Sequence, residues 1–168
     1  KINYVVWRDV YICPECGGTI VYWNEAIDLE RGIRRDEFNC PHCDRLVARS
    51  PSKKSQASKL EHTWDIKMDD ALHKTIKEIK RVPVLINYSI KKPGRNHKIR
   101  YEKKPDEVDI AKIKKIEYII IPYWYPINKI PEGDKTGEPI RIGIKHVHHF
   151  YTKRNLYILS KFVDCINK

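Results

Sequence analysis

The sequence predicts an α+β fold, in which a small β module built on four cysteines precedes a mixed α+β domain that ends in a C-terminal helix. Three observations lead to this prediction: two Cys-Pro-x-Cys pairs within residues 1–50, β-branched and aromatic runs through the first half, and an amphipathic pattern near the end. A polar, small and basic stretch without periodicity separates the two parts. We therefore expect a module over residues 1–50, a linker over 51–60 and a basic domain over 61–168.

Strands are predicted where β-branched and aromatic residues follow one another. These runs are residues 4–12, Thr19–Trp23, Leu46–Ala48, Glu61–Met68 and Val84–Tyr88. Between the last two, residues 71–80 place Leu72, Ile76 and Ile79 at helical spacing, so a short helix is expected there, and Pro83 would stop it near Arg81.

Two helices are predicted in the C-terminal third. Asp106 follows a proline and can cap a helix that carries isoleucines along one stripe. Thr152 can cap the final helix, which runs to about Ile166 with its apolar residues on one face. Residues 121–143 are rich in proline and glycine, and we expect an irregular connection or edge strands there.

The cysteine pattern predicts a structural zinc site. Cys13-Pro-Glu-Cys16 and Cys40-Pro-His-Cys43 each place two thiolates three residues apart, which brings both to one ion only through a tight turn. The residue after each second cysteine often needs a positive φ, which Gly17 and Asp44 tolerate. Two such turns flanked by short strands indicate a zinc ribbon with one ion. Four thiolates close the coordination, so this zinc would hold the fold and activate no water.

The basic charge is concentrated in the middle of the chain. The formal net charge is +11, and residues 51–104 hold 15 basic and 6 acidic side chains, whereas residues 1–50 hold 7 and 8. The densest stretch surrounds a Pro-Gly pair, which predicts a turn between two extended arms. Such a hairpin can neutralise phosphates or can be a solvated surface. Its candidate phosphate contacts are Lys91, Lys92, Arg95, Lys98 and Arg100.

Two other stretches carry chemically versatile side chains. His146-Val-His148-His149 could bind a metal, but alternation along a strand explains it more simply, with His146 and His148 on one face and His149 on the other. Four residues of this region could contact a phosphate near a helix start: Lys145, His148, Lys153 and Arg154. Tyr123, Trp124 and Tyr125 could stack on a base, although packing against a sheet is the more common role of such residues.

Several runs resemble the zinc-binding insert of a family of site-specific DNA methyltransferases of the adenine type. They include Ile2–Cys16, Asp36–Cys43, Val82–Ser89, Ile121–Pro126 and Gly143–Leu156, the last being the most distinctive. The family transfers a methyl group from S-adenosylmethionine to an exocyclic amino nitrogen of a DNA base. Its Asp-Pro-Pro-aromatic loop and its glycine-rich cofactor loop are both missing from this sequence. The resemblance implies that the parent protein is the enzyme and that this segment has no catalytic residue.

The expected function is therefore DNA binding and target recognition within a longer methyltransferase, in the cytoplasm and without a membrane segment. The expected partners are duplex DNA and the catalytic domain of the same polypeptide; S-adenosylmethionine would bind to that domain and not to this segment. Two alternatives stay open. The chain could be a zinc-ribbon module that binds another protein, or a stand-alone zinc-ribbon protein that binds RNA.

Overall fold

The computed structural model describes residues 1–91 and 97–167. The chain forms two compact units. The first unit contains Lys1–Trp64 and Ile79–Pro105, and the second contains Asp65–Glu78 together with the chain from Asp106 onward. This grouping differs from the expected boundary at residues 51–60, because the chain leaves the first unit after Trp64 and returns to it at Ile79.

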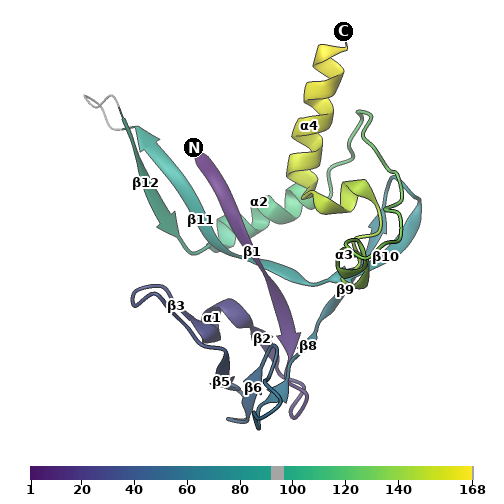
Figure 1. The fold of residues 1–168 in the computed structure, drawn as a ribbon. Helices are drawn as coiled ribbons and strands as arrows, with labels where there is room; N and C mark the ends of the chain where they lie inside the picture. The colour runs from purple at the N-terminus through teal and green to yellow at the C-terminus, as the bar shows by residue number, and fades with distance from the viewer. Residues whose placement is uncertain (92–96, 168) are drawn as a thin grey trace. The chain divides into compact units, whose positions relative to one another are not determined.

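An antiparallel sheet organises the first unit (Figure 1). Its central strands are β1 (Ile2–Ile12) and β11 (Arg81–Lys91), which pair along most of their length. β12 (Lys98–Lys103) pairs with the other edge of β11. Near its C-terminal end β1 pairs with two short strands, β2 (Thr19–Val21) and β8 (Glu61–His62).

Pro83 lies inside β11, where a proline cannot donate a ladder hydrogen bond. The register between β1 and β11 shifts between Val6 and Trp7, and Trp7 faces Pro83. Because the ladder is already irregular at this point, the missing N–H does not interrupt a regular pair of hydrogen bonds. The proline that was expected to end a helix near Arg81 therefore lies within a strand.

The cysteine module follows β1 and has a core of its own. Tyr11, Tyr22, Phe38 and Val47 are buried there together with Cys13 and Cys40. After β2 the module contains α1 (Tyr22–Ala26), β3 (Ile27–Asp28), β4 (Ile33–Arg34), β5 (Glu37–Asn39), β6 (Leu46–Ala48) and β7 (Ser58–Lys59). β7 pairs in parallel with β6, so part of the stretch expected to be a linker belongs to this module.

The second unit combines a two-stranded hairpin with helices. The hairpin is formed by β9 (Trp64–Asp69) and β10 (Lys74–Ile79). The helices are α2 (Glu107–Glu117), α3 (Gly137–Arg141), the 3-10 helix η1 (Val147–Phe150) and α4 (Lys153–Ile166). None of the helices in the described residues is long and apolar enough to span a membrane.

Both predicted helix caps are confirmed. The Asp106 carboxylate accepts a hydrogen bond from the backbone N–H of Asp109 at 2.9 Å, and the Asp109 carboxylate accepts one from the N–H of Asp106 at 3.2 Å. This reciprocal pair is a capping box. Thr152 Oγ1 accepts from the backbone N–H of Asn155 at 3.4 Å, and α4 ends at Ile166 as expected.

Four expectations about local structure differ from the structure. The strand expected over Thr19–Trp23 ends at Val21, where α1 follows, and residues 137–141 of the expected irregular connection form α3. Residues 74–79 form β10 instead of a helix, because they pair with β9 across a turn in which the Asp69 carboxylate accepts two backbone N–H groups. Residues 147–150 form a 3-10 turn instead of a strand, so consecutive histidines do not alternate between two faces. The pairing of β10 with β9 and the contact of η1 with Asp69 override the local sequence pattern.

Gly143 provides a test of the second unit's packing. Its φ is +96°, and a Cβ built there would lie 2.5 Å from the carbonyl oxygen of Lys77 and 2.7 Å from Cα of Glu78. We expect Gly143→Ala to destabilise this unit by more than about 1 kcal/mol, because strained backbone and a clash with β10 add up. Hydrogen exchange of the amides of β10 and η1 measures the effect.

Gly133→Ala is the matched control, since its added Cβ would meet only Thr136 Oγ1 at 3.6 Å, an ordinary contact. Equal protection from exchange in the two variants would contradict the packing described for Gly143.

Candidate metal and nucleic-acid sites

Four cysteines converge on one point in the first unit. Cys13 directly follows β1 and Cys40 directly follows β5, and the two turns that begin there bring Cys16 and Cys43 beside them. The sulfur atoms of Cys13 and Cys43 are 3.9 Å apart, and those of Cys16 and Cys40 are 3.8 Å apart. A tetrahedral ion bound through sulfur at about 2.3 Å requires sulfurs about 3.8 Å apart. The cluster therefore has the size of a four-thiolate metal site.

Each pair of cysteines is shaped by the same turn. The backbone N–H of Gly17 donates to the carbonyl of Cys13 at 2.9 Å, and that of Asp44 donates to the carbonyl of Cys40 at 2.9 Å. Gly17 and Asp44 have φ values of +71° and +59°, which confirms the positive φ predicted after each second cysteine. Asp44 tolerates this conformation and accepts a hydrogen bond from the Asn39 side chain.

The two turns also contact each other. His42 Nε2 forms a hydrogen bond with the carbonyl of Thr19 at 3.0 Å, and His42 is not among the four clustered side chains. Its imidazole ring lies directly over Gly18, so a Cβ at Gly18 would overlap the ring. Gly18 is therefore required for close approach of the two turns and not for its φ.

The pKa values of Cys13 and Cys43 are shifted in opposite directions. Burial acts to raise the pKa of Cys13, but hydrogen bonds from the backbone and from the other thiols outweigh it and lower this pKa to about 7. The backbone N–H of Arg45 favours the thiolate of Cys43, yet desolvation and the neighbouring thiols raise its pKa to about 12. A bound cation favours the thiolate over the thiol, so metal binding and ionisation of the cluster are coupled.

The basic hairpin presents charges on one face. Lys91 and Lys98 are opposite each other in the β11–β12 ladder, and Arg100 lies two residues beyond Lys98, so all three side chains project from the same side. All three are exposed. No ion pair engages them among the residues that the structure describes. The other two predicted contacts, Lys92 and Arg95, lie outside the described residues.

The predicted contacts near α4 have different surroundings. Lys145 and Arg154 are exposed. Lys153 Nζ forms an ion pair with Asp70 at 2.6 Å, so its charge is already neutralised. His148 is buried and hydrogen-bonded to Asp69, and in this conformation it cannot reach a phosphate in solvent.

Of the three predicted stacking residues, only one is freely accessible. Tyr123 packs edge-on against Tyr157, and Tyr125 lies against His148 with ring centroids 5.9 Å apart. Trp124 is 73% exposed and lines a shallow depression with residues of α4. The indole of Trp124 is thus available for stacking, whereas Tyr123 and Tyr125 pack against other side chains.

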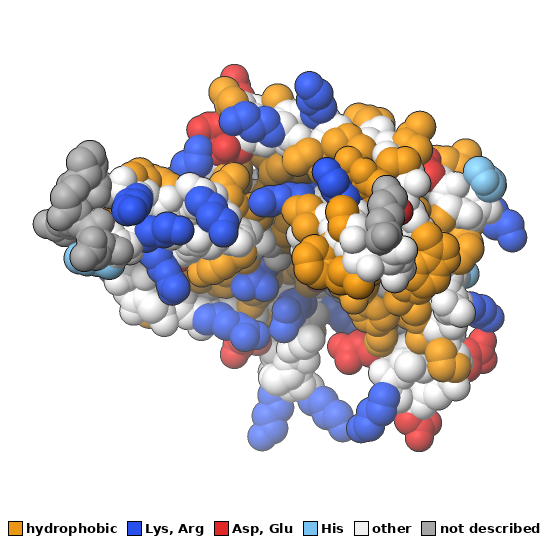
Figure 2. All heavy atoms as spheres, turned by 90° about the horizontal axis from the view of Figure 1, so that it is seen from above, with side chains coloured by type: hydrophobic (Ala, Val, Ile, Leu, Met, Phe, Trp, Pro, Cys, Tyr) orange, Lys and Arg blue, Asp and Glu red, His pale blue; other side chains and the backbone are white. Residues whose placement is uncertain are grey.

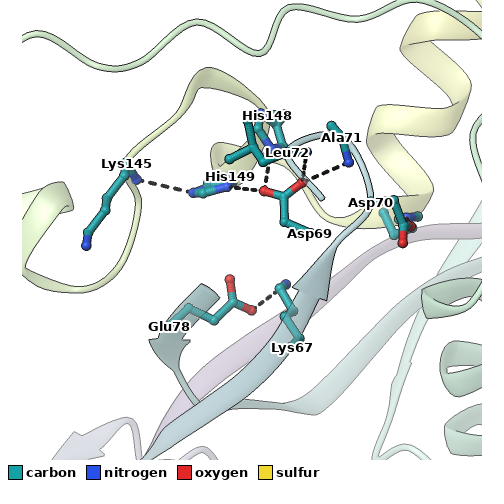
Figure 3. Close-up of polar contacts among 10 residues, drawn as sticks. Lys67, Asp69, Asp70, Ala71, Leu72, Glu78, Lys145, His148 and His149 are labelled. Carbon is teal, nitrogen blue, oxygen red and sulfur yellow. Dashed lines mark hydrogen bonds and ion pairs between the residues drawn. The ribbon is translucent and has the colours of Figure 1, made fainter. Parts of the chain in front are cut away.

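The structure reveals one cluster that the sequence reasoning missed. Asp69 at the end of β9 contacts both His148 and His149 of η1, and Figure 3 shows the two imidazoles directed at one carboxylate oxygen. The three side chains could hold a metal ion. The histidine run was visible in the sequence, but nothing near Asp69 marked it as their partner 79 residues away.

Comparison of the chain with protein-family models, with curated proteins and with solved structures finds no match. The interpretation of the sites therefore depends on their geometry and on the residues themselves.

The contact between Gly18 and His42 generates a prediction for metal affinity. Gly18→Ala should weaken metal binding by the four cysteines, because the new methyl group forces the His42 ring away and separates the two turns. Competition for zinc with a coloured chelator measures this affinity.

The double variant Gly18→Ala with His42→Ala should recover most of the loss, since the smaller side chain leaves room for the methyl group. A double variant as weak as the single one would show that Gly18 acts in another way.

Proposed function

We propose that this chain is a non-catalytic DNA-binding segment of a DNA methyltransferase, in which a zinc ribbon stabilises a basic target-recognition surface. The observation that carries the proposal is the row of Lys91, Lys98 and Arg100 on one face of the β11–β12 hairpin. In Figure 2 lysine and arginine side chains gather over this hairpin.

Duplex DNA suits such a surface because its phosphates carry one negative charge about every 1.7 Å of helix axis. Side chains that neutralise phosphates release counterions, which supplies affinity and fixes the position of the protein. Trp124 is an accessible aromatic side chain of the kind that stacks on exposed bases. An enzyme that modifies a base outside the stack needs both kinds of contact around the catalytic pocket.

We assign the ion of the cysteine cluster as zinc. Soft thiolate ligands in a tetrahedral arrangement favour zinc over the harder magnesium and calcium ions. Closed four-thiolate coordination leaves no position for water, so the zinc would contribute folding energy and no chemistry. Each of the two turns would then supply half of a zinc ribbon, with Cys13 and Cys40 buried in the module's core.

The methyltransferase assignment comes from the resemblance of the runs named above. S-adenosylmethionine and the transfer step would belong to the remaining domain of the parent polypeptide, because residues 1–168 carry neither family motif for them. This chain would contribute DNA positioning. Because the resemblance is to enzymes that act on DNA, we expect this chain to be located in the cytoplasm.

A second candidate function is docking onto another protein, and α4 favours it. Of its residues only Leu156 and Ser160 are buried. Its exposed apolar side chains are Ile158, Leu159, Phe162, Val163 and Ile166. Hydrophobic side chains gather around the end of this helix in Figure 2. Such a face is typical of an interaction surface, and the catalytic domain of the parent enzyme is the partner that this function would require.

A salt titration tests the DNA proposal. The chain should bind duplex DNA with an affinity that falls steeply as salt rises, because each phosphate contact contributes about 0.9 to the logarithmic slope. Replacing Lys91, Lys98 and Arg100 by glutamine should make that slope shallower by roughly 2 to 3 and weaken binding at low salt. Fluorescence anisotropy with a labelled duplex measures both.

The matched control replaces three exposed lysines of α2 by glutamine, which changes the net charge equally: Lys112, Lys114 and Lys115. The two triple variants should differ clearly. A flat salt dependence of the unmodified chain would reject DNA binding and leave the protein-docking function.

Removal of one ligand tests the structural role of zinc. Cys13→Ser should lose one equivalent of zinc and disorder the module's core, because metal-binding energy is folding energy in such a site. Zinc content by mass spectrometry and near-ultraviolet circular dichroism measure the two effects. Cys165→Ser should change neither, since that cysteine is exposed on α4 and outside the cluster. Full zinc content in Cys13→Ser would contradict the assignment.

A further inference from the structure

Asp69 is held in a fixed position at the turn between β9 and β10. Its Oδ1 accepts hydrogen bonds from the backbone N–H groups of Ala71 at 3.0 Å and Leu72 at 3.2 Å. The other oxygen, Oδ2, is directed at η1 (Figure 3). A carboxylate oriented in this way has one oxygen bound to the backbone and one available to a ligand, as in metal sites whose ligands are fixed by outer hydrogen bonds.

Two consecutive histidines meet that oxygen. His148 Nε2 lies 2.9 Å and His149 Nε2 lies 2.8 Å from Oδ2 of Asp69. The 3-10 turn makes this possible, since neighbouring residues of an extended strand would point in opposite directions. The side chains of Asp69 and His149 are 4% exposed and that of His148 is 7% exposed, so water does not separate the three groups.

The cluster also contains polar atoms that have no partner. Nδ1 of His148 and Nδ1 of the neighbouring His146 are buried without a hydrogen bond among the described residues. Unsatisfied buried nitrogens cost free energy, and folded proteins retain few of them without a reason. His146 adds a third imidazole beside Asp69, with its ring centroid 5.1 Å from that of His149.

We propose that Asp69, His148 and His149 form a second metal site, which binds a divalent transition ion such as zinc through Oδ2 and the two Nε2 atoms. Two imidazoles and a carboxylate are a ligand set of borderline softness that suits zinc and its neighbours and not magnesium or calcium. Three protein ligands leave at least one coordination position for water or for an added group. This site is independent of the four cysteines and of DNA binding.

The proton balance defines how this site differs from the cysteine cluster. In the metal-free state Nε2 of His149 donates to Asp69, because Nδ1 of the same ring accepts the backbone N–H of Lys145. Binding the ion through Nε2 moves the His149 proton to Nδ1, so this ring releases no net proton, whereas each cysteine thiol must lose one. The backbone N–H of Lys145, which now donates to Nδ1 of His149 at 3.2 Å, must then give up that contact.

The ion therefore replaces hydrogen bonds that already hold the metal-free cluster together. The second unit can keep its fold without this ion, whereas the cysteine module depends on its own. We infer that the second ion is held more weakly than the thiolate-bound one and exchanges while the protein stays folded.

A cobalt titration of the full chain, purified without a polyhistidine tag and stripped of metal, tests the proposal. The first equivalent of Co²⁺ should give the intense near-ultraviolet absorption of cobalt thiolate. A second equivalent should add only weak visible bands, because its ligands are nitrogen and oxygen. In nitrogen-15 spectra the second equivalent should move the His149 proton from Nε2 to Nδ1, which a purely structural histidine would not show.

Asp69→Asn should abolish the second equivalent while keeping the first, since asparagine can still accept the backbone N–H groups of the turn. His149→Gln is a second variant with the same expected result, and hydrogen exchange of β10 reports whether each remains folded. His97→Gln is the control, because His97 is exposed and belongs to the other unit. Saturation of the unmodified chain at one equivalent, or a second equivalent that survives both variants, would overturn the proposal.

Discussion

The convergence of four cysteine sulfurs is the constraint on which the first unit depends. Cys13 directly follows β1, and β1 is the strand that pairs with β11, β2 and β8. A small module buries little apolar surface, and a metal ion held by these sulfurs would add to the stability of its core. Fixing the end of β1 helps to hold the strands that pair with it, and β11 in turn pairs with β12, where Lys91, Lys98 and Arg100 share one face.

In the second unit the buried carboxylate of Asp69 has a role like that of the cysteine sulfurs in the first unit, because it brings together side chains from distant parts of the sequence. Burial acts to raise the pKa of Asp69, but hydrogen bonds from His149, from His148 and from the turn outweigh it and lower this pKa to about 2. The carboxylate thus stays charged at neutral pH, and it joins the turn of the β9–β10 hairpin to η1. In the first unit the cysteine cluster lies within an apolar core, whereas in the second unit α4 leaves most of its apolar residues exposed.

Features set by short-range chemistry could be predicted from the sequence, and features set by distant partners could not. The positive φ at Gly17 and Asp44, the caps at Asp106 and Thr152 and the end of α4 at Ile166 follow from local rules, and all were predicted. The pairing of β10 with β9 depends on a partner strand, so its helical spacing was misleading. The apolar face of α4 was predicted correctly from the spacing of its residues. That spacing does not indicate whether the face is buried or exposed in the fold.

The interleaving of the two units has a consequence for biosynthesis. A ribosome completes the whole first unit once Pro105 has emerged, whereas the second unit then consists of the β9–β10 hairpin alone. Asp69 must remain hydrated until η1 is made, because its two histidine partners lie 79 and 80 residues further along the chain. A two-stranded hairpin by itself is only marginally stable in water. During synthesis the β9–β10 hairpin therefore lies between two stretches of the first unit while its own partners have not yet been made. The time needed to translate residues 106–150 sets how long the hairpin lacks these partners.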